Sequence, residues 1–301
     1  MAIYDCCLFF NENDIFEIRL NQHWDFVDRF IVVEAGETHT GLKKPFNFDH
    51  ERFRPYASKI EYRSFDSFDE AIKNNPEYYD ALDDQIHDFK PEWRRDDFQG
   101  NYCFKVLNEI GAKDDDIVLL SPPDEIVKKS AMLEAVERFK DPAVYDITDA
   151  SERVSVKASR PIFHVMMPLY IYKFNLITTD TPTRPFASIS EFGNYRKIFP
   201  SLARNVGLVT HPAIENGGWH FSYHDSTDGE RVLEKMKSWA HATDSGRGLN
   251  GARRMDAATP SEAIQILINE FNMKIVPVAR DTHPDYIVDN QERFSNFIIN
   301  Q

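Results

Sequence analysis

The first half of the chain alternates the pattern of buried strands with the pattern of helices. Residues 3–10 form an apolar run with few breaks, which is typical of a strand buried on both faces. Residues 15–27 carry apolar side chains at helical spacing, and residues 30–33 form a second apolar run. Strand, helix and strand within about thirty residues predict a βαβ unit, and therefore a parallel sheet.

The same alternation continues along the chain and becomes less regular in the second half. The remaining predicted strands are 59–62, 117–120, 162–167 and 219–223, and the remaining predicted helices are 93–110, 132–139 and 230–241. A last helix is predicted to begin at Thr259, where Thr-Pro-Ser-Glu matches a capping box with proline at the first helical position. We expect one α/β domain over 1–301, with a mostly parallel central sheet and C-terminal helical additions.

Composition narrows the class of protein. The chain is 42% hydrophobic and 28% charged, which excludes general disorder. Its net charge of −14 argues against nonspecific binding to nucleic acid or anionic lipid, because the summed field repels phosphate. The three cysteines, Cys6, Cys7 and Cys103, fall in predicted strand or helix and are expected to be buried small apolar residues.

The chain shows no signal for export or membrane insertion. The N-terminus has no basic region and turns polar after ten residues, unlike a signal peptide. The longest apolar stretch, 166–177, is interrupted by Lys173 and is shorter than the ~20 residues that a membrane span needs. We therefore expect a protein of the cytoplasm.

Polar side chains stand where the predicted parallel strands end. Asn11 and Glu12 follow the first strand, and Glu34 follows the second. Ligands of parallel sheets bind beyond the carboxyl ends of the strands. Asp124 and Glu125 follow the strand at 117–120, and hard carboxylate oxygens in this position suit Mg²⁺ or Mn²⁺. The alternative is that these acids only form a turn or cap a helix.

Two further segments could carry chemistry. In 215–223, paired glycines precede Trp219, whose flat face suits a sugar or base, and His220, which could bind a metal or carry a proton. The alternative for this segment is a glycine turn before an ordinary strand. Arg94 and Arg95 could pair with phosphate, or could form a solvated helix face. The chain lacks GxSxG, GxxxxGK[ST], HExxH and GxGxxG, which disfavours hydrolase, P-loop and dinucleotide-binding functions.

Taken in order, these segments resemble glycosyltransferase family 17. The resemblance begins with the block at 4–48 and continues through the Asp-Asp-Ile strand and the Asp-Glu-Ile that follows it at 124–126. It then includes Gly-Trp-His-Phe-Ser-Tyr at 218–223 and finishes in 284–294. The best-known members of this family add a bisecting N-acetylglucosamine to N-glycans through a β-1,4 linkage.

The resemblance implies an inverting glycosyltransferase on a GT-A-like nucleotide-binding sandwich. Residues 1–150 would bind the nucleotide-sugar donor, with a UDP-sugar as the expected donor, and 151–301 would form the acceptor side. A glycan or glycoconjugate is the implied acceptor. The implied donor-binding residues are Asn11, Glu12, Glu34, Asp124 and Glu125, to which Arg95 and Trp219 are added for their side-chain chemistry.

One residue departs from the family pattern Ser-Asp-x-Asp-Glu-Ile. Pro122 stands in place of the first aspartate, and proline offers neither a side-chain ligand nor an N–H. In one interpretation, Asp124 with His220 or water still holds Mn²⁺ or Mg²⁺. In the other, the metal is dispensable and cations neutralise the diphosphate. The cations considered for that role are Lys128, Lys129 and Arg95.

Inverting transfer requires one general base on the acceptor side. Glu215 is the first candidate from the sequence, followed by Asp225 and Glu191. Pro122 also supports an alternative function, that of a degenerate, non-catalytic member that binds sugar or nucleotide. A hydrolase using Asp124 and Glu125 is disfavoured, because adjacent residues of an extended chain point to opposite sides.

Golgi members of the family carry a membrane anchor. The sequence shows no such segment, which suggests a soluble bacterial or viral relative.

Overall fold

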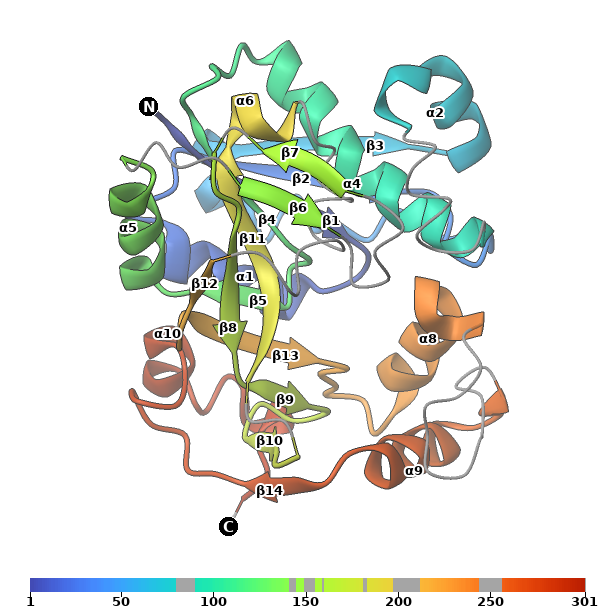
Figure 1. The fold of residues 1–301 in the computed structure, drawn as a ribbon. Helices are drawn as coiled ribbons and strands as arrows, with labels where there is room; N and C mark the ends of the chain where they lie inside the picture. Colours follow the sequence, from blue (N-terminus) through green and yellow to red (C-terminus); the bar gives the residue numbers. More distant parts are fainter. Residues whose placement is uncertain are drawn as a thin grey trace.

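The computed structural model describes residues 1–79, 90–140, 145–148, 155–158, 160–180, 183–196, 212–243 and 256–300. Within these ranges, two sheets form the body of the protein, a large one and a small one, and a separate strand pair accompanies them (Figure 1). The described helices are α1 (Asn13–His23), α2 (Phe68–Asn74), α4 (Pro91–Glu109), α5 (Lys129–Arg138), α6 (Phe192–Tyr195), α8 (Glu230–Ser238), α9 (Pro260–Glu270) and α10 (Asp285–Asp289).

The large sheet has seven strands in the order β12-β8-β11-β4-β1-β2-β3. Its strands are β1 (Ile3–Phe9), β2 (Arg29–Ala35), β3 (Ile60–Phe65), β4 (Ile117–Leu120), β8 (Phe163–Met167), β11 (Arg184–Glu191) and β12 (Ala213–Ile214). Strands β3, β2, β1 and β4 are parallel to one another, as the βαβ pattern predicts. Each of the strand and helix regions predicted in the first 140 residues is present.

The expectation of a mostly parallel sheet is wrong, because the sheet is mixed. Strand β11 lies antiparallel to both of its neighbours, β4 and β8. The sequence does not predict β11, since its RPFASISE segment lacks the continuous apolar run that is typical of buried parallel strands. The separate pair of β6 (Tyr145–Thr148) and β7 (Ser155–Ala158) is also antiparallel.

The small sheet is a second feature that the sequence pattern does not predict. It contains β5 (Glu125–Val127), β9 (Leu169–Ile171), β10 (Leu176–Thr178), β13 (Gly218–Ser222) and β14 (Met273–Ile275), in the order β14-β10-β9-β13-β5. Most of its strands have only three residues, too few to show a clear period. Helices α8 and α9 lie beside this sheet (Figure 1), so the C-terminal additions are strands as well as helices.

Alternate residues of β1 pack on opposite faces of the large sheet, as expected for a buried strand. Cys6 and Leu8 pack with residues of α4, including Cys103. Cys7 and Phe9 pack instead with residues of α1. The three cysteines are free and buried, which confirms the expectation that they serve as small apolar core residues.

The capping box predicted at the last long helix is present in a modified form. The Thr259 hydroxyl accepts a hydrogen bond from the Glu262 N–H, and the Glu262 carboxylate accepts one from the N–H of Ala258. Helix α9 therefore begins where the sequence predicts. None of the helices in the described ranges combines the length and apolar character that crossing a bilayer requires.

A fully buried arginine joins α1 to the turn that follows β4. The guanidinium of Arg19 donates hydrogen bonds to the carboxylate of Asp5 on β1 and to the hydroxyl of Ser121. It also donates to the backbone carbonyls of Pro122 at 2.6 Å and Glu125 at 2.9 Å. The side chain of Arg19 thus holds the turn at 121–125, which lies about a hundred positions later in the chain.

His23, one turn further along α1, extends this buried network to β5. Burial lowers the pKa of His23, so the imidazole is neutral at pH 7. Its Nδ1–H donates to the Asp5 carboxylate, and its Nε2 accepts the Val127 N–H at 3.1 Å. Burial tends to raise the pKa of Asp5, but Arg19 and His23 outweigh that effect and lower it from 3.8 to about 2.

Replacement of Asp5 by asparagine should destabilise the fold by about 3–5 kcal/mol at pH 7, because it leaves the Arg19 charge buried and unpaired. The wild-type carboxylate has a lower pKa folded than unfolded, so its stabilisation is complete above about pH 4 and is lost as the pH falls toward 2. Chemical denaturation measures the free energy of unfolding of both proteins. The difference between wild type and variant should shrink by about 2 kcal/mol as the pH falls from 4 to 2. A difference that stays constant with pH would contradict this account.

Candidate functional site

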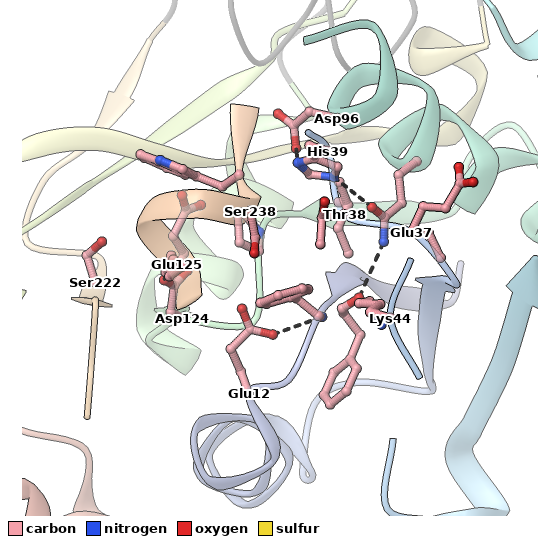
Figure 2. A pocket seen from close by; sticks show the side chains of 18 of the residues that line it. Glu12, Glu37, Thr38, His39, Lys44, Asp96, Asp124, Glu125, Ser222 and Ser238 are labelled. Atoms are coloured by element: carbon pink, nitrogen blue, oxygen red, sulfur yellow. Dashed lines mark hydrogen bonds and ion pairs between the residues drawn. The ribbon is translucent and has the colours of Figure 1, made fainter. Parts of the chain in front are cut away.

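A pocket opens where the carboxyl ends of β1 and β2 meet the small sheet and α8. The residues that line it come from six separate segments of the sequence, and most of its polar side chains are acidic or basic. They are Leu8, Phe9, Phe10, Glu12, Ala35, Glu37, Thr38, His39, Lys44, Asp96, Gln99, Pro122, Asp124, Glu125, His220, Ser222, Lys235, Ser238 and Trp239. Figure 2 shows Glu12 and Lys44 on one side of the pocket, with His39 and Asp96 on the opposite side.

Asp124 forms the centre of the charged part of the pocket. Its Oδ2 atom lies 2.7 Å from the Nζ of Lys235 and 3.7 Å from the Nε2 of His220. Burial tends to raise the pKa of Asp124, but Lys235 and His220 hold it well below its usual range. Asp124 raises the pKa of Lys235 in turn, against the lowering effect of burial, so both groups are charged at neutral pH.

Strand pairing brings His220 to Asp124. Strand β5 begins at Glu125 and runs antiparallel to β13, with His220 opposite Glu125. The Phe221 N–H donates to the Asp124 carbonyl at 2.8 Å, which fixes the register directly beside the acidic turn. The ring of Phe186 packs edge-on against His220 at 4.1 Å. The two blocks singled out in the sequence are therefore neighbours in space.

Glu12 projects from the turn after β1. Its Oε2 accepts hydrogen bonds from the N–H groups of Phe10 at 2.9 Å and Asn11 at 3.0 Å. Burial raises the pKa of Glu12, and the charge of Asp124 adds to this rise, although Lys235 opposes it. The neighbouring Asn11 is turned away and donates to the Glu234 carboxylate of α8 at 2.6 Å.

Glu34 lies beneath the pocket and does not line it. Its fully buried carboxylate accepts hydrogen bonds from the Lys44 ammonium at 2.7 Å and from the Tyr62 hydroxyl at 2.9 Å. It also accepts from the backbone N–H groups of Asn47 and Phe48. This carboxylate therefore folds the loop after β2 so that Lys44 lines the pocket.

The opposite wall is built by α4 and the loop after β2. Gln99 donates to the carbonyl of Val33 at 2.8 Å, and its Oε1 accepts from His39 Nε2 at 2.9 Å. His39 Nδ1 lies 3.6 Å from the carboxylate of Asp96. Arg95 donates to the His39 carbonyl at 2.8 Å and is not among the lining residues. Arg95 thus braces the loop beside the pocket.

Besides Asn11, Glu34 and Arg95, four further residues expected at the site lie outside the pocket lining. Trp219 is buried in the core with Ile126, so its ring does not present a face to this pocket. Glu215 is exposed in the turn between β12 and β13. Glu191 pairs with Arg160, and it lies opposite Ile117, at the other end of β4 from the acidic turn.

Asp225 is the fourth of these residues, and it organises the start of α8. Its fully buried carboxylate accepts hydrogen bonds from the N–H and hydroxyl of Thr227 and from the N–H of Val232. Helix α8 carries Lys235 one turn beyond Val232. Asp225 therefore acts on the pocket through the position of the helix.

The donor atoms present do not fit a divalent cation. Pro122 contributes no side-chain oxygen, and the Asp124 carboxylate is engaged by an ammonium. Within the described ranges, no three His, Cys, Asp or Glu side chains are placed to hold one ion. A cation site of Asp124 and His220 stays a prediction from the sequence.

Sequence reasoning did not find several lining residues, of which Lys235 is the most important. Helix α8 was predictable, since Val232 and Met236 are buried one turn apart. The pairing of Lys235 with Asp124 joins positions 111 residues apart, and no local pattern signals it. His39 and Lys44 lie in a loop whose path depends on the buried Glu34.

A mixed α/β sheet with a charged pocket at the carboxyl ends of its parallel strands is typical of a ligand-binding α/β protein. Residues 1–143 match the model of a family described as "Glycosyltransferase family 17". The matched segment is 143 of the 301 residues, just under half of the chain, and it supports the resemblance to this family and a glycosyltransferase function. The resemblance stated from the sequence is thereby confirmed.

Comparisons with solved structures and with curated proteins do not indicate a function. The solved structure "Crystal Structure of a Mycobacterial Protein" matches with 10% identity and a TM-score of 0.34. The match covers 96% of this chain and 88% of that chain, but a TM-score this low carries no argument. A comparison with curated proteins finds no match.

Asp225→Asn tests whether this residue is structural or catalytic. The variant should lower the free energy of unfolding by about 1–3 kcal/mol, because a buried acceptor of several hydrogen bonds is weakened. Thermal denaturation measures this effect, and sugar transfer at a temperature where the variant is folded measures its activity. Unchanged stability with turnover reduced a hundredfold or more would instead identify Asp225 as the general base proposed from the sequence.

Proposed function

We propose that this protein is an inverting glycosyltransferase of GT-A-like architecture. It would transfer a sugar, with N-acetylglucosamine as the first candidate, from a UDP-sugar to a glycan acceptor through a β linkage. The family match over 1–143 supports the glycosyltransferase class. The donor sugar, the nucleotide and the stereochemical course are our proposal.

The observation that carries the proposal is the convergence of Glu12, Asp124 and His220 in one pocket. These residues come from three of the four blocks on which the family resemblance rests, and two of them lie at the carboxyl ends of parallel strands. The N-terminal half of the chain supplies Glu12 and Asp124, and the C-terminal half supplies β13 and α8. A donor bound here would have its diphosphate beside Asp124 and its partners.

The proposed reaction is a single displacement at the anomeric carbon. The acceptor hydroxyl oxygen forms the new bond to this carbon, and its proton passes to a general base. The bond from the anomeric carbon to the diphosphate oxygen breaks, and its electron pair leaves with the nucleoside diphosphate. Positive charge near that oxygen stabilises the departing group.

Of Glu12, Glu37 and Asp124, three of the carboxylates that line the pocket, Glu12 suits the general base best. Asp124 is paired with Lys235, and its pKa is held low. Glu37 is paired with Lys43, which lowers its pKa although burial tends to raise it. The raised pKa of Glu12 brings it nearer to neutral pH, where a general base is most efficient.

Glu12→Gln should reduce turnover by about 10²–10⁴ while the affinity for the nucleoside diphosphate stays within about threefold. Glutamine retains the oxygen that accepts the Phe10 and Asn11 N–H groups, so the turn should persist. Steady-state kinetics and calorimetry measure the two effects. Loss of affinity with unchanged turnover at saturation would place Glu12 at the donor, the role that the resemblance implies. Glu215→Gln is the matched control, because Glu215 is exposed outside the pocket.

Pro122 favours a second candidate function, a non-catalytic protein that binds a nucleotide or sugar. It lines the pocket at the position where the family pattern has an aspartate. A protein of this kind would bind the ligand without transferring the sugar. The two candidates therefore share a binding site and differ only in turnover.

Thermal denaturation with a panel of nucleoside diphosphates and nucleotide sugars tests the proposal. A ligand at a hundred times its Kd adds about 2.7 kcal/mol to stability, so the correct nucleotide should raise the Tm measurably. Donor hydrolysis or transfer to a glycan panel should accompany binding. Nucleotide binding without donor hydrolysis or sugar transfer would support the non-catalytic function. If no nucleotide binds, with or without Mn²⁺, both candidate functions are refuted.

A further inference from the structure

We propose that the ammonium of Lys235 supplies, within this protein, the positive charge that holds the donor diphosphate, so that the pocket needs no divalent cation. This inference rests on the proposed function, because it concerns how the same pocket binds its donor. Lys128, Lys129 and Arg95 are the candidates for this role from the sequence, and the structure favours Lys235 instead.

Lys235 occupies the place where a cation is needed. Its Nζ lies 2.7 Å from Asp124, the acid that survives from the family motif, and its side chain lines the pocket with 18% exposure. Within the described part of the chain, Asp124 is the one acceptor that hydrogen-bonds to this ammonium. An ammonium has three donors, so the group can hold Asp124 and still donate to phosphate oxygens.

The ammonium is held in position before any ligand binds. Tyr223 and Trp239 place their rings 5.4 Å and 5.9 Å from Nζ, where each ring attracts the cation. The buried Asp225 carboxylate fixes the start of α8, and the Asn11 amide binds Glu234 on the same helix. A charge fixed in this way stabilises an anion without the cost of reorganisation at the moment of reaction.

The negative charge of the pocket lining means that an anionic ligand needs a cation beside it. Carboxylates are frequent in the pocket lining, and a diphosphate entering among them is repelled unless positive charge is close by. Lys44 is the other lysine in the lining, and Glu34 and the Pro45 carbonyl hold its ammonium. Lys235 and Lys44 together can face the two phosphates of a nucleoside diphosphate.

The cations considered from the sequence are less suitable. Lys128 is bound to the carbonyl and side chain of Asn216, and its ammonium lies over Trp219. Lys129 is exposed at the start of α5. Arg95 donates to the carbonyl of His39. None of the three belongs to the pocket lining.

The first experiment compares metal-free and metal-loaded binding in the wild-type protein. Calorimetry should give the same Kd, within about threefold, for the best-binding nucleoside diphosphate in EDTA and in Mn²⁺. Sugar transfer or donor hydrolysis should likewise persist in EDTA. Binding that requires Mn²⁺ would overturn this inference while leaving the proposed function intact. If no nucleotide binds in either condition, the proposed function itself fails.

The second experiment separates a ligand-binding role from simple charge balance at Asp124. Lys235→Met should weaken nucleoside diphosphate binding in EDTA by about 10- to 100-fold, the loss expected for charge-assisted hydrogen bonds. The variant leaves Asp124 buried without its partner and should be less stable. The double variant D124N/K235M removes both charges and should regain stability but not affinity. Lys237→Met, on the same helix outside the pocket lining, is the control and should bind as the wild type does.

Affinity of D124N/K235M equal to that of the wild type would overturn the inference, because Lys235 would then serve only to neutralise Asp124. A complementary variant, P122D/K235A, restores the family motif and removes the ammonium. It should bind Mn²⁺ in electron paramagnetic resonance titrations at concentrations where the wild type binds none. Mn²⁺ binding by the wild type with equal affinity would contradict the proposal independently of any activity.

Discussion

The buried ion pair between Asp5 and Arg19 is the constraint on which the rest of the site depends. It joins β1 to α1, and the same guanidinium holds the carbonyls of Pro122 and Glu125. Because Asp124 lies between those two carbonyls, its position is set by an interaction inside the first βαβ unit. Breaking such a pair is costly, because it leaves an uncompensated charge in the core. The geometry of the pocket is therefore coupled directly to the stability of the fold.

The distribution of charge in the pocket follows from this arrangement. The turn at 121–125 directs one carboxylate toward α8, where Lys235 neutralises it, while Glu12 keeps a raised pKa. Two acids in one pocket thus have opposite pKa shifts because one has a cation beside it and the other is mainly desolvated. This separation suits one acid to binding and the other to proton transfer.

Much of the first half of the fold could be predicted from the sequence, because its strands are continuous apolar runs and its helices have a clear period. Most of the small sheet and β11 could not, since β5, β9 and β10 have three residues each and β11 mixes small and polar residues. In the second half, β8, β13, α8 and α9 do match predicted segments. Glu12, Asp124 and His220 could be predicted as pocket residues because they follow or lie within recognisable blocks. Lys235 could not, because its role depends on tertiary packing. For the same reason, the sequence could not show that Trp219 is buried in the core.

The short pairing of β5 with β13 has a wider consequence for how the family is compared. The matched segment ends at residue 143, whereas His220 and Lys235 both lie beyond it and reach Asp124 through the small sheet and α8. Relatives could therefore share the whole matched segment and still differ in the charge that faces their acidic turn. On our proposal for Lys235, a comparison limited to the N-terminal half would leave out the residue whose ammonium faces the acidic turn.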